Sequence, residues 1–268
     1  MNKNLYFKEL KRNRKSLIVW SAVVIAFTFI VMSVFPYMRD MGDDMAVMMS
    51  KLPEGMLKAM GIDAETFKGI LGMYNTYYGI YIIVLLSIFA SSTGATIISK
   101  EEKDKTAEFL LTKPISRKNI YITKMLVLIT LALTAFLIQT ITAIIFIIGF
   151  GEENVNWSVF VTMHLHGLVL ILFFTCIGVF LSMLIKPKKN FMGITVGIVF
   201  GSYFLNAIAQ VGGNLSWLGY LSPFHYLDFS VTDPNYSVNV PQVFIFLFLS
   251  AALLILSFRL YKSKDISA

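Results

Sequence analysis

The sequence has little charge and almost no cysteine. Asp, Glu, Lys and Arg make up 15% of its 268 residues, and hydrophobic residues make up 56%, whereas about a quarter of a soluble domain is charged. The single cysteine, Cys176, lies in an apolar run, so no intrachain disulfide can form and a small core residue is expected there. This composition excludes an ordinary soluble domain and predicts an integral membrane protein.

Motifs for catalysis and metal binding are also missing. The chain has no G-x-x-x-x-G-K-[ST] phosphate loop, no H-E-x-x-H, no G-x-S-x-G and no Cys/His cluster with metal spacing. His164 and His166 are two residues apart and point to different faces of a helix, so they make a poor metal pair and we expect structural roles. No ionisable pair lies within the apolar runs to act as an ion relay. We therefore expect no enzyme activity, cofactor or metal in this chain, and an energy source outside it.

Six apolar runs dominate what is present. Each has at least 18 residues without Asp, Glu, Lys or Arg, which is long enough to cross a bilayer as a helix. The runs are continuous and do not alternate, so they do not indicate a membrane β-barrel. We predict an all-α membrane protein with six transmembrane helices at Leu17–Tyr37, Tyr74–Ser99, Met125–Phe150, Val159–Ile185, Phe191–Val211 and Val243–Leu260.

The basic residues gather on one side of these runs. Nineteen of the 23 Lys and Arg residues lie in the N-terminal segment, the region 100–124, the connector 186–189 and the C-terminal segment. The positive-inside rule places those segments, and both termini, in the cytoplasm. This distribution explains the net charge of +7 without a nucleic acid partner. We expect a multi-pass protein of a bacterial plasma membrane, in contact with its lipids.

The first 16 residues hold six basic residues and, between them, the apolar side chains of Tyr6, Phe7 and Leu10. If helical, this segment is typical of an elbow helix that lies on an anionic membrane surface before the first span. A basic flank that only sets topology is the alternative.

Small and polar residues within the spans suggest contacts. Gly193, Gly197 and Gly201 recur every four residues, which allows close approach of another helix, either from the same chain or from a second copy. A second set of polar residues either lines a substrate route or forms hydrogen bonds between helices. That second set comprises Asn75, Thr76, Tyr78, Asn206 and Gln210. The aromatic-rich connector 211–241 is expected to lie on the outer surface or to re-enter the membrane.

The segment 100–118, KEEKDKTAEFLLTKPISRK, lies between the second and third spans and joins dense charge to a short apolar group. It resembles the first cytoplasmic loop of the permease subunits of ABC-2 type ATP-binding cassette transporters, although Lys105 stands where the family usually has glycine. The turn LSPFHYLD before the last span and the C-terminal FRLYKSKDI are also similar to that family. The loop resemblance rests on Glu101, Glu102, Thr106, Glu108, Leu110, Leu111, Pro114, Ser116 and Arg117.

The resemblance implies that residues 1–268 form a single transmembrane domain. It would pair with a second permease copy or a related permease, and with two ATP-binding cassette subunits that hold ATP and Mg. The loop would form a coupling helix in a cleft of the ATPase, with Phe109, Leu110 and Leu111 as an apolar anchor and its acids facing basic residues of the partner. Pro114 would end that helix and Ser116 would cap the third span. The alternatives are a solvated loop that only sets topology and, for function, a membrane scaffold or sensor that recruits an ATPase without transport.

Overall fold

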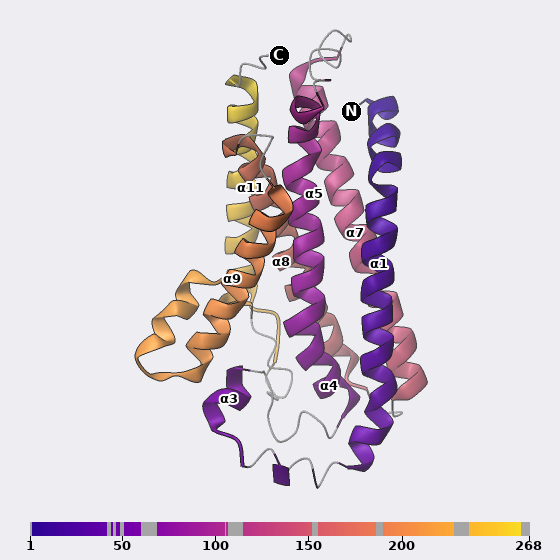
Figure 1. The fold of residues 1–268 in the computed structure, drawn as a ribbon, viewed down its shortest axis with the longest axis vertical. Helices are drawn as coiled ribbons and strands as arrows, with labels where there is room; N and C mark the ends of the chain where they lie inside the picture. Colours follow the sequence, from indigo (N-terminus) through magenta and orange to yellow (C-terminus); the bar gives the residue numbers. More distant parts are fainter. Residues whose placement is uncertain are drawn as a thin grey trace.

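The protein, seen in a computed structural model, is a bundle of long helices. The structure describes residues 2–41, 44, 47–48, 51–59, 69–104, 106, 115–151, 155–185, 190–227 and 236–263, and these contain no strand. The long helices run along the long axis of the molecule (Figure 1). The first turn of α1, the last turn of α5, the first turn of α7 and the last turn of α11 lie at the same end.

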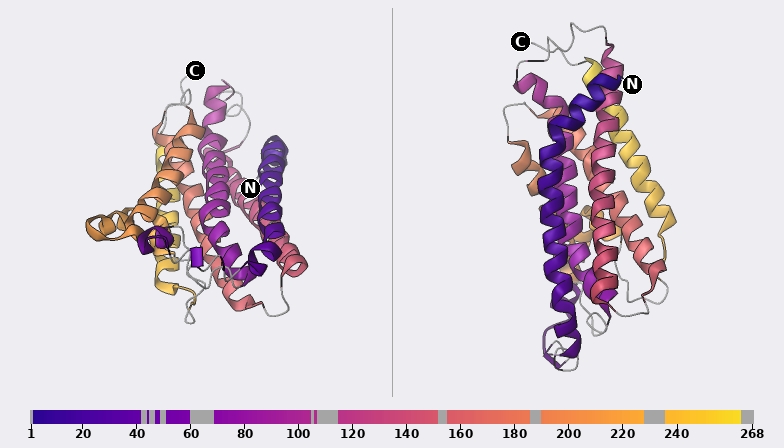
Figure 2. Two further views of the ribbon diagram at one scale, coloured as in Figure 1. Left: turned by 60° about the horizontal axis from the view of Figure 1, so that its bottom comes forward. Right: turned by 90° about the vertical axis from the view of Figure 1, so that its right-hand side faces the viewer.

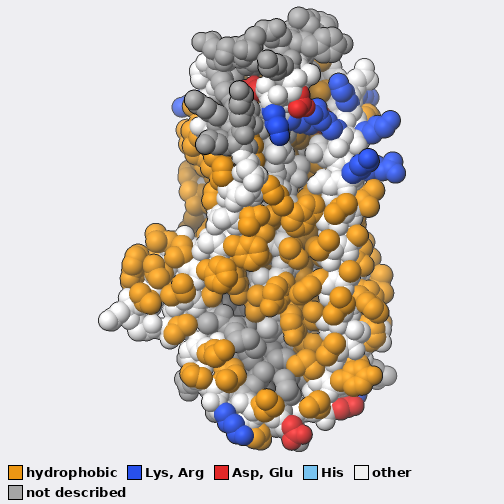
Figure 3. Space-filling view, in the orientation of Figure 1, with side chains coloured by type: hydrophobic (Ala, Val, Ile, Leu, Met, Phe, Trp, Pro, Cys, Tyr) orange, Lys and Arg blue, Asp and Glu red, His pale blue; other side chains and the backbone are white. Residues whose placement is uncertain are grey.

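Within the described ranges, six helical spans are long and apolar enough to cross a membrane, as the sequence predicts. Hydrophobic side chains cover the middle of the visible face, and charged side chains lie toward the two ends (Figure 3). This pattern and the six spans identify a multi-pass membrane protein. The spans are α1 (Lys3–Asp40), the continuous run α4 (Ile70–Tyr77), η1 (Tyr78–Ile82) and α5 (Ile83–Lys103), α7 (Arg117–Phe150), α8 (Trp157–Leu184), α9 (Phe191–Val211) and α11 (Val240–Ser263).

The first span is longer than predicted. The Asn2 side chain caps α1 by accepting a hydrogen bond from the Leu5 backbone N–H at 3.0 Å, and no Pro or Gly interrupts residues 3–35. The segment expected as a separate elbow is therefore continuous with the span, although its first turns bend away from the axis below them (Figure 2). Contact of these turns with a membrane surface stays a prediction.

The second span is the most buried of the six and packs closely against α8. A Cβ atom at Gly178 of α8 would lie 2.0 Å from the carbonyl oxygen of Ser91 on α5. A Cβ atom at Gly94 of α5 would lie 2.7 Å from the carbonyl oxygen of Thr175 on α8. Both distances are shorter than any real contact, so glycine at these two positions is what allows the α5 and α8 backbones to meet.

The glycine face of α9 that the sequence predicts, Gly193, Gly197 and Gly201, has no helix packed closely against it among the described residues. A Cβ atom at Gly197 or Gly201 would meet nothing within 4 Å, and one at Gly193 would meet only the side chain of Asn190, which caps α9. All three glycines are exposed. Within the described part of the chain, no helix packs against Gly197 or Gly201. Of the two partners that the sequence allowed, a helix of the same chain is therefore not found among the described residues, and a second copy stays a prediction.

The connector after α9 projects sideways from the bundle (Figures 1 and 2). Gly212 and Gly213 have φ angles of +90° and +71°, a backbone conformation that favours glycine, and turn the chain into the 3-10 helix η2 (Gly213–Leu221) and the short α10 (Pro223–Tyr226). Helix α3 (Glu54–Ala59), between the first two spans, packs against α9. Trp217 and Tyr220 on η2 are exposed. A place for them at the lipid headgroups remains a prediction.

Candidate functional site

The segment that resembles the ABC-2 loop begins in the last turn of α5. Glu101 and Glu102 lie in that turn, Thr106 follows it, and Ser116 and Arg117 stand at the start of α7. Backbone hydrogen bonds from Asp104 N to Lys100 O and from Thr106 N to Glu101 O, both 2.8 Å, close the end of α5. The remaining predicted coupling residues, Glu108, Phe109, Leu110, Leu111 and Pro114, lie outside the described residues.

The Glu101 side chain contacts another helix of the same chain. Its carboxylate forms an ion pair with the ammonium group of Lys124 on α7, and the same ammonium donates a hydrogen bond to Ile97 O at 2.6 Å. The Lys124 side chain is 2% exposed and that of Glu101 is 11% exposed. In this conformation an internal lysine holds the Glu101 carboxylate, and the contact of Glu101 with a partner chain stays a prediction. Glu102 is half-buried and Thr106 is exposed.

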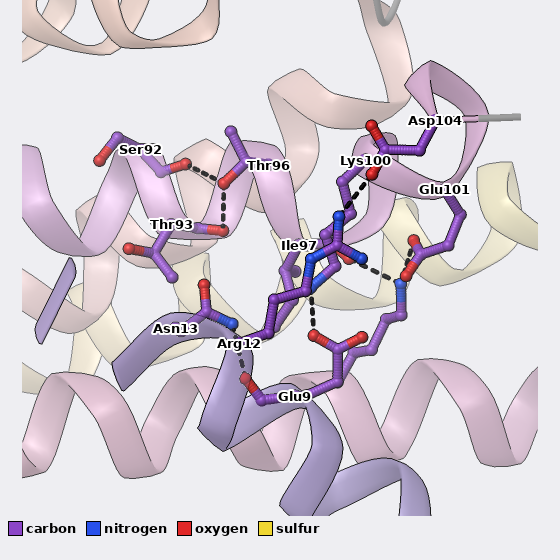
Figure 4. A network of polar contacts seen from close by, with 11 residues as sticks. Glu9, Arg12, Asn13, Ser92, Thr93, Thr96, Ile97, Lys100, Glu101 and Asp104 are labelled. Carbon is purple, nitrogen blue, oxygen red and sulfur yellow. Dashed lines mark hydrogen bonds and ion pairs between the residues drawn. The ribbon is translucent and has the colours of Figure 1, made fainter. Parts of the chain in front are cut away.

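Helix α1 contributes to the same end of the bundle (Figure 4). Glu9 forms an ion pair with Lys100, and the two side chains are 4% and 12% exposed. Arg12 pairs with Asp104 at the surface. Sequence reasoning missed Glu9 and Lys124, although there was one signal, since Glu9 is the only acid among the first 16 residues.

The start of α7 is attached to α11. Ser116 caps α7 as predicted, because its hydroxyl accepts a hydrogen bond from Asn119 N at 3.3 Å. Arg117 Nη1 donates to the carbonyl oxygen of Lys262 at 3.3 Å. The Tyr121 hydroxyl donates to Leu254 O at 2.8 Å, and its ring packs against Phe258 with 5.1 Å between centroids. The helices on either side of the loop thus have different attachments: α5 pairs with α1 and α7, whereas α7 also packs along α1 and bonds α11.

The predicted route residues lie on α4, η1 and α9. Asn75 and Thr76 are buried on α4, and Tyr78 is buried on η1, where its ring lies 4.6 Å from that of His164. On α9, Asn206 is buried and Gln210 is exposed. Their use as a substrate route stays a prediction.

Both histidines take part in buried hydrogen bonds. Gln139 Nε2 donates to the Tyr74 hydroxyl at 2.6 Å, and this hydroxyl donates to His164 Nε2 at 3.1 Å because His164 Nδ1 must donate to the carbonyl oxygen of Phe160, 2.8 Å away. His166 Nε2 accepts from the backbone N–H of Asn239 at 3.2 Å. Each histidine therefore links α8 to another segment, which agrees with the structural roles expected from their spacing.

The fold and the location of its charges define a helical multi-pass membrane protein whose second and third spans are joined at a charged end. A family model described as ABC-2 family transporter protein matches residues 3–266. The chain belongs to this family, and it is a permease component of an ABC transporter, a membrane transport component that is not itself catalytic. Comparison with the curated proteins found no match.

Proposed function

We propose that the chain is the permease subunit of an exporter driven by two separate ATP-binding cassette subunits, which hold ATP and Mg. The observation that carries the proposal is the charged end of the bundle. In a chain of the ABC-2 family, ion pairs there hold the last turn of α5 directly before the loop that resembles the coupling loop. Binding of ATP by the partner subunits would displace this loop and tilt the helices between inward and outward openings.

The loop is the proposed contact with the ATPase subunits. Thr106 is exposed and Glu102 is half-buried at its beginning, and the Ser116 cap begins α7 at its end. The acids Glu102 and Glu108 are proposed to pair with basic residues of the partner around an apolar anchor at 109–111. In this arrangement the loop and both termini lie in the cytoplasm of a bacterial cell, as the distribution of Lys and Arg favours.

The permease pair is proposed to form through the exposed glycine face of α9 together with α1. Gly197 and Gly201 have open space where a helix of a second copy or of a related permease would fit. Ile18, Val23 and Ile30 on α1 are exposed apolar residues. A Gly201→Leu variant should lose pairing in detergent by size-exclusion chromatography with light scattering. Gly149→Leu is the matched control, since Gly149 is also helical and open, and a normal dimer with normal transport for Gly201→Leu would refute this interface.

The transported substrate is proposed to be lipid-like, peptidic or amphiphilic. The middle parts of the six spans carry no Asp, Glu, Lys or Arg, which argues against a bare ion as cargo. Asn75, Thr76, Tyr78 and Asn206 are buried in this conformation, so their use as a route requires that helices separate during the cycle.

A pull-down of the tagged chain from native membranes tests the coupling contact. The wild type should retain a soluble ATPase, and the double variant Glu108→Lys/Leu111→Asp should lose it. The matched control makes similar changes at the opposite end of the bundle, Asp40→Lys/Leu52→Asp, where both side chains are exposed. The absence of any ATPase from the wild-type sample would contradict the coupling proposal.

The second candidate is a scaffold or sensor that recruits an ATPase and moves nothing. It is favoured by the burial of the predicted route residues Asn75, Thr76, Tyr78 and Asn206 in this conformation. The two functions are separated in vesicles that contain the chain and the captured ATPase. A transporter gives ATPase stimulation by cargo and vectorial uptake, and a scaffold gives neither.

A further inference from the structure

Four buried charged side chains join three helices at the charged end of the bundle. Glu9 of α1 pairs with Lys100 of α5 (Figure 4). Glu101 of α5 pairs with Lys124 of α7. These side chains are between 2% and 12% exposed. The two acids and two bases sum to no net charge, so the group can remain ionised inside the protein.

Stability alone does not explain this arrangement. Removing two charges from water costs several kcal/mol per ion, so a buried pair is often no more stabilising than apolar residues of the same size. Apolar helix faces, however, allow many nearly equivalent registers, whereas an ion pair with directed hydrogen bonds favours one. Lys124 illustrates this, because its ammonium group bonds both the Glu101 carboxylate and the Ile97 carbonyl oxygen. The group therefore specifies how α1, α5 and α7 lie against one another.

The position of the group in the chain connects it to the loop. Glu101 lies in the last turn before the loop, and Lys124 lies in the second turn after it, so their ion pair joins the two helices at the base of the loop. Lys100, next to Glu101, carries the connection to α1 through Glu9. A displacement of the loop therefore reaches three helices through two adjacent residues of α5.

We propose that Glu9, Lys100, Glu101 and Lys124 are positioning residues that make the ends of α1, α5 and α7 a single rigid body, so that loop movement is transmitted to α1 as well as to α5 and α7. The source of the loop movement rests on the proposed function, whereas the rigidity depends only on residues of this chain. The exposed pair Arg12–Asp104, whose side chains are 45% and 43% exposed, joins the same α1 and α5 and serves as the matched control, because surface pairs contribute little.

The experiment measures distances within the purified chain in lipid nanodiscs. In a Cys176→Ala background, spin labels at Lys11→Cys and Lys103→Cys report on α1 against α5, and labels at Lys103→Cys and Lys118→Cys report on α5 against α7. The unaltered network should give narrow distance distributions for both pairs. Glu9→Gln should broaden the first distribution and leave the second narrow, and Arg12→Gln should broaden neither.

The double variant Glu101→Leu/Lys124→Met separates positioning from stability. It leaves no unpaired charge at the base of the loop, so its thermal unfolding should match that of the parent, yet its α5–α7 distribution should broaden. The exchanged pair Glu101→Lys/Lys124→Glu should restore a narrow distribution. Distributions that stay narrow in Glu9→Gln and in the double apolar variant would overturn the proposal. The test needs no ATPase, so its failure is distinct from a failure of the pull-down, which tests the proposed function.

Discussion

The close contact between α5 and α8 leads to a quantitative prediction for Gly178→Ala. The added Cβ atom would lie 2.0 Å from Ser91 O and 2.8 Å from Ser91 C, and both are backbone atoms that cannot rotate away. Ordinary van der Waals contact begins at 3.4 Å. The α5 backbone must therefore move from α8 by about 1.4 Å, a distance that disturbs packing along the most buried span of the bundle.

The expected cost follows from two opposing effects. Overpacking of a well-packed core costs about 1–3 kcal/mol, whereas replacing a helical glycine by alanine gains up to about 1 kcal/mol. Because the clash is with backbone atoms, the overpacking cost should lie in the upper part of its range, about 2–3 kcal/mol, and the free energy of unfolding should fall by about 1–2 kcal/mol. With a shift of about 2–4 °C per kcal/mol for a chain of roughly this size, Tm should fall by about 2–8 °C.

Cys176 makes the assay possible. It is the only cysteine in the chain and is buried on α8, so a thiol-reactive dye labels it as the protein unfolds in detergent on heating. Gly197→Ala is the control, because its Cβ atom would meet nothing within 4 Å and its Tm should be unchanged or slightly raised. Gly94→Ala, with a nearest backbone contact of 2.7 Å, should fall between the two. A Gly178→Ala protein that unfolds at or above the temperature of the Gly197→Ala protein would refute the reasoning.

Two further predictions concern the buried hydrogen bonds and the orientation in the membrane. Tyr74→Phe leaves His164 Nε2 without its hydrogen-bond donor in the protein interior, so it should lower the free energy of unfolding by about 1–3 kcal/mol. Tyr6→Phe should cost less, because the Tyr6 hydroxyl is half-buried and bonds one threonine. The same dye assay should give a lower Tm for Tyr74→Phe than for Tyr6→Phe, and equal Tm values would contradict this. The orientation is tested in intact cells that produce the Cys176→Ala protein. A membrane-impermeant maleimide should label Asp40→Cys, whereas Lys118→Cys should react only after permeabilisation. The reverse pattern would contradict the proposed cytoplasmic location of the loop.

The six spans were predictable because each depends on local sequence. A continuous apolar run of about 18 residues or more is helical in a bilayer whatever its neighbours are, since every backbone polar group must be bonded within the helix. The Ser116 cap was predictable for the same reason, because a cap involves residues three apart. The charged ends of α1, α5 and α7 were not predictable in this way. A span predicted from hydropathy stops at the first charged residue, although the helix continues past it.

The charges and glycines show which contacts the sequence did not reveal. Glu101 matches a family motif and was expected to face a partner, but its carboxylate lies against Lys124, 23 positions away. The regular spacing of Gly197 and Gly201 predicted close helix packing, yet the glycines that α5 and α8 use, Gly94 and Gly178, stand singly on two helices. A spacing motif is visible only when both small residues are on one helix.

The amino-acid sequence by itself determined that this is a membrane protein with six helical spans and a charged loop of the ABC-2 type, because hydropathy, charge asymmetry and a short motif are local properties. The tertiary structure decided which glycines bring helices together, which charges are paired inside the protein, and which faces stay open. Those outcomes depend on the rotation and register of helices distant in sequence, which result from the packing of all six spans at once.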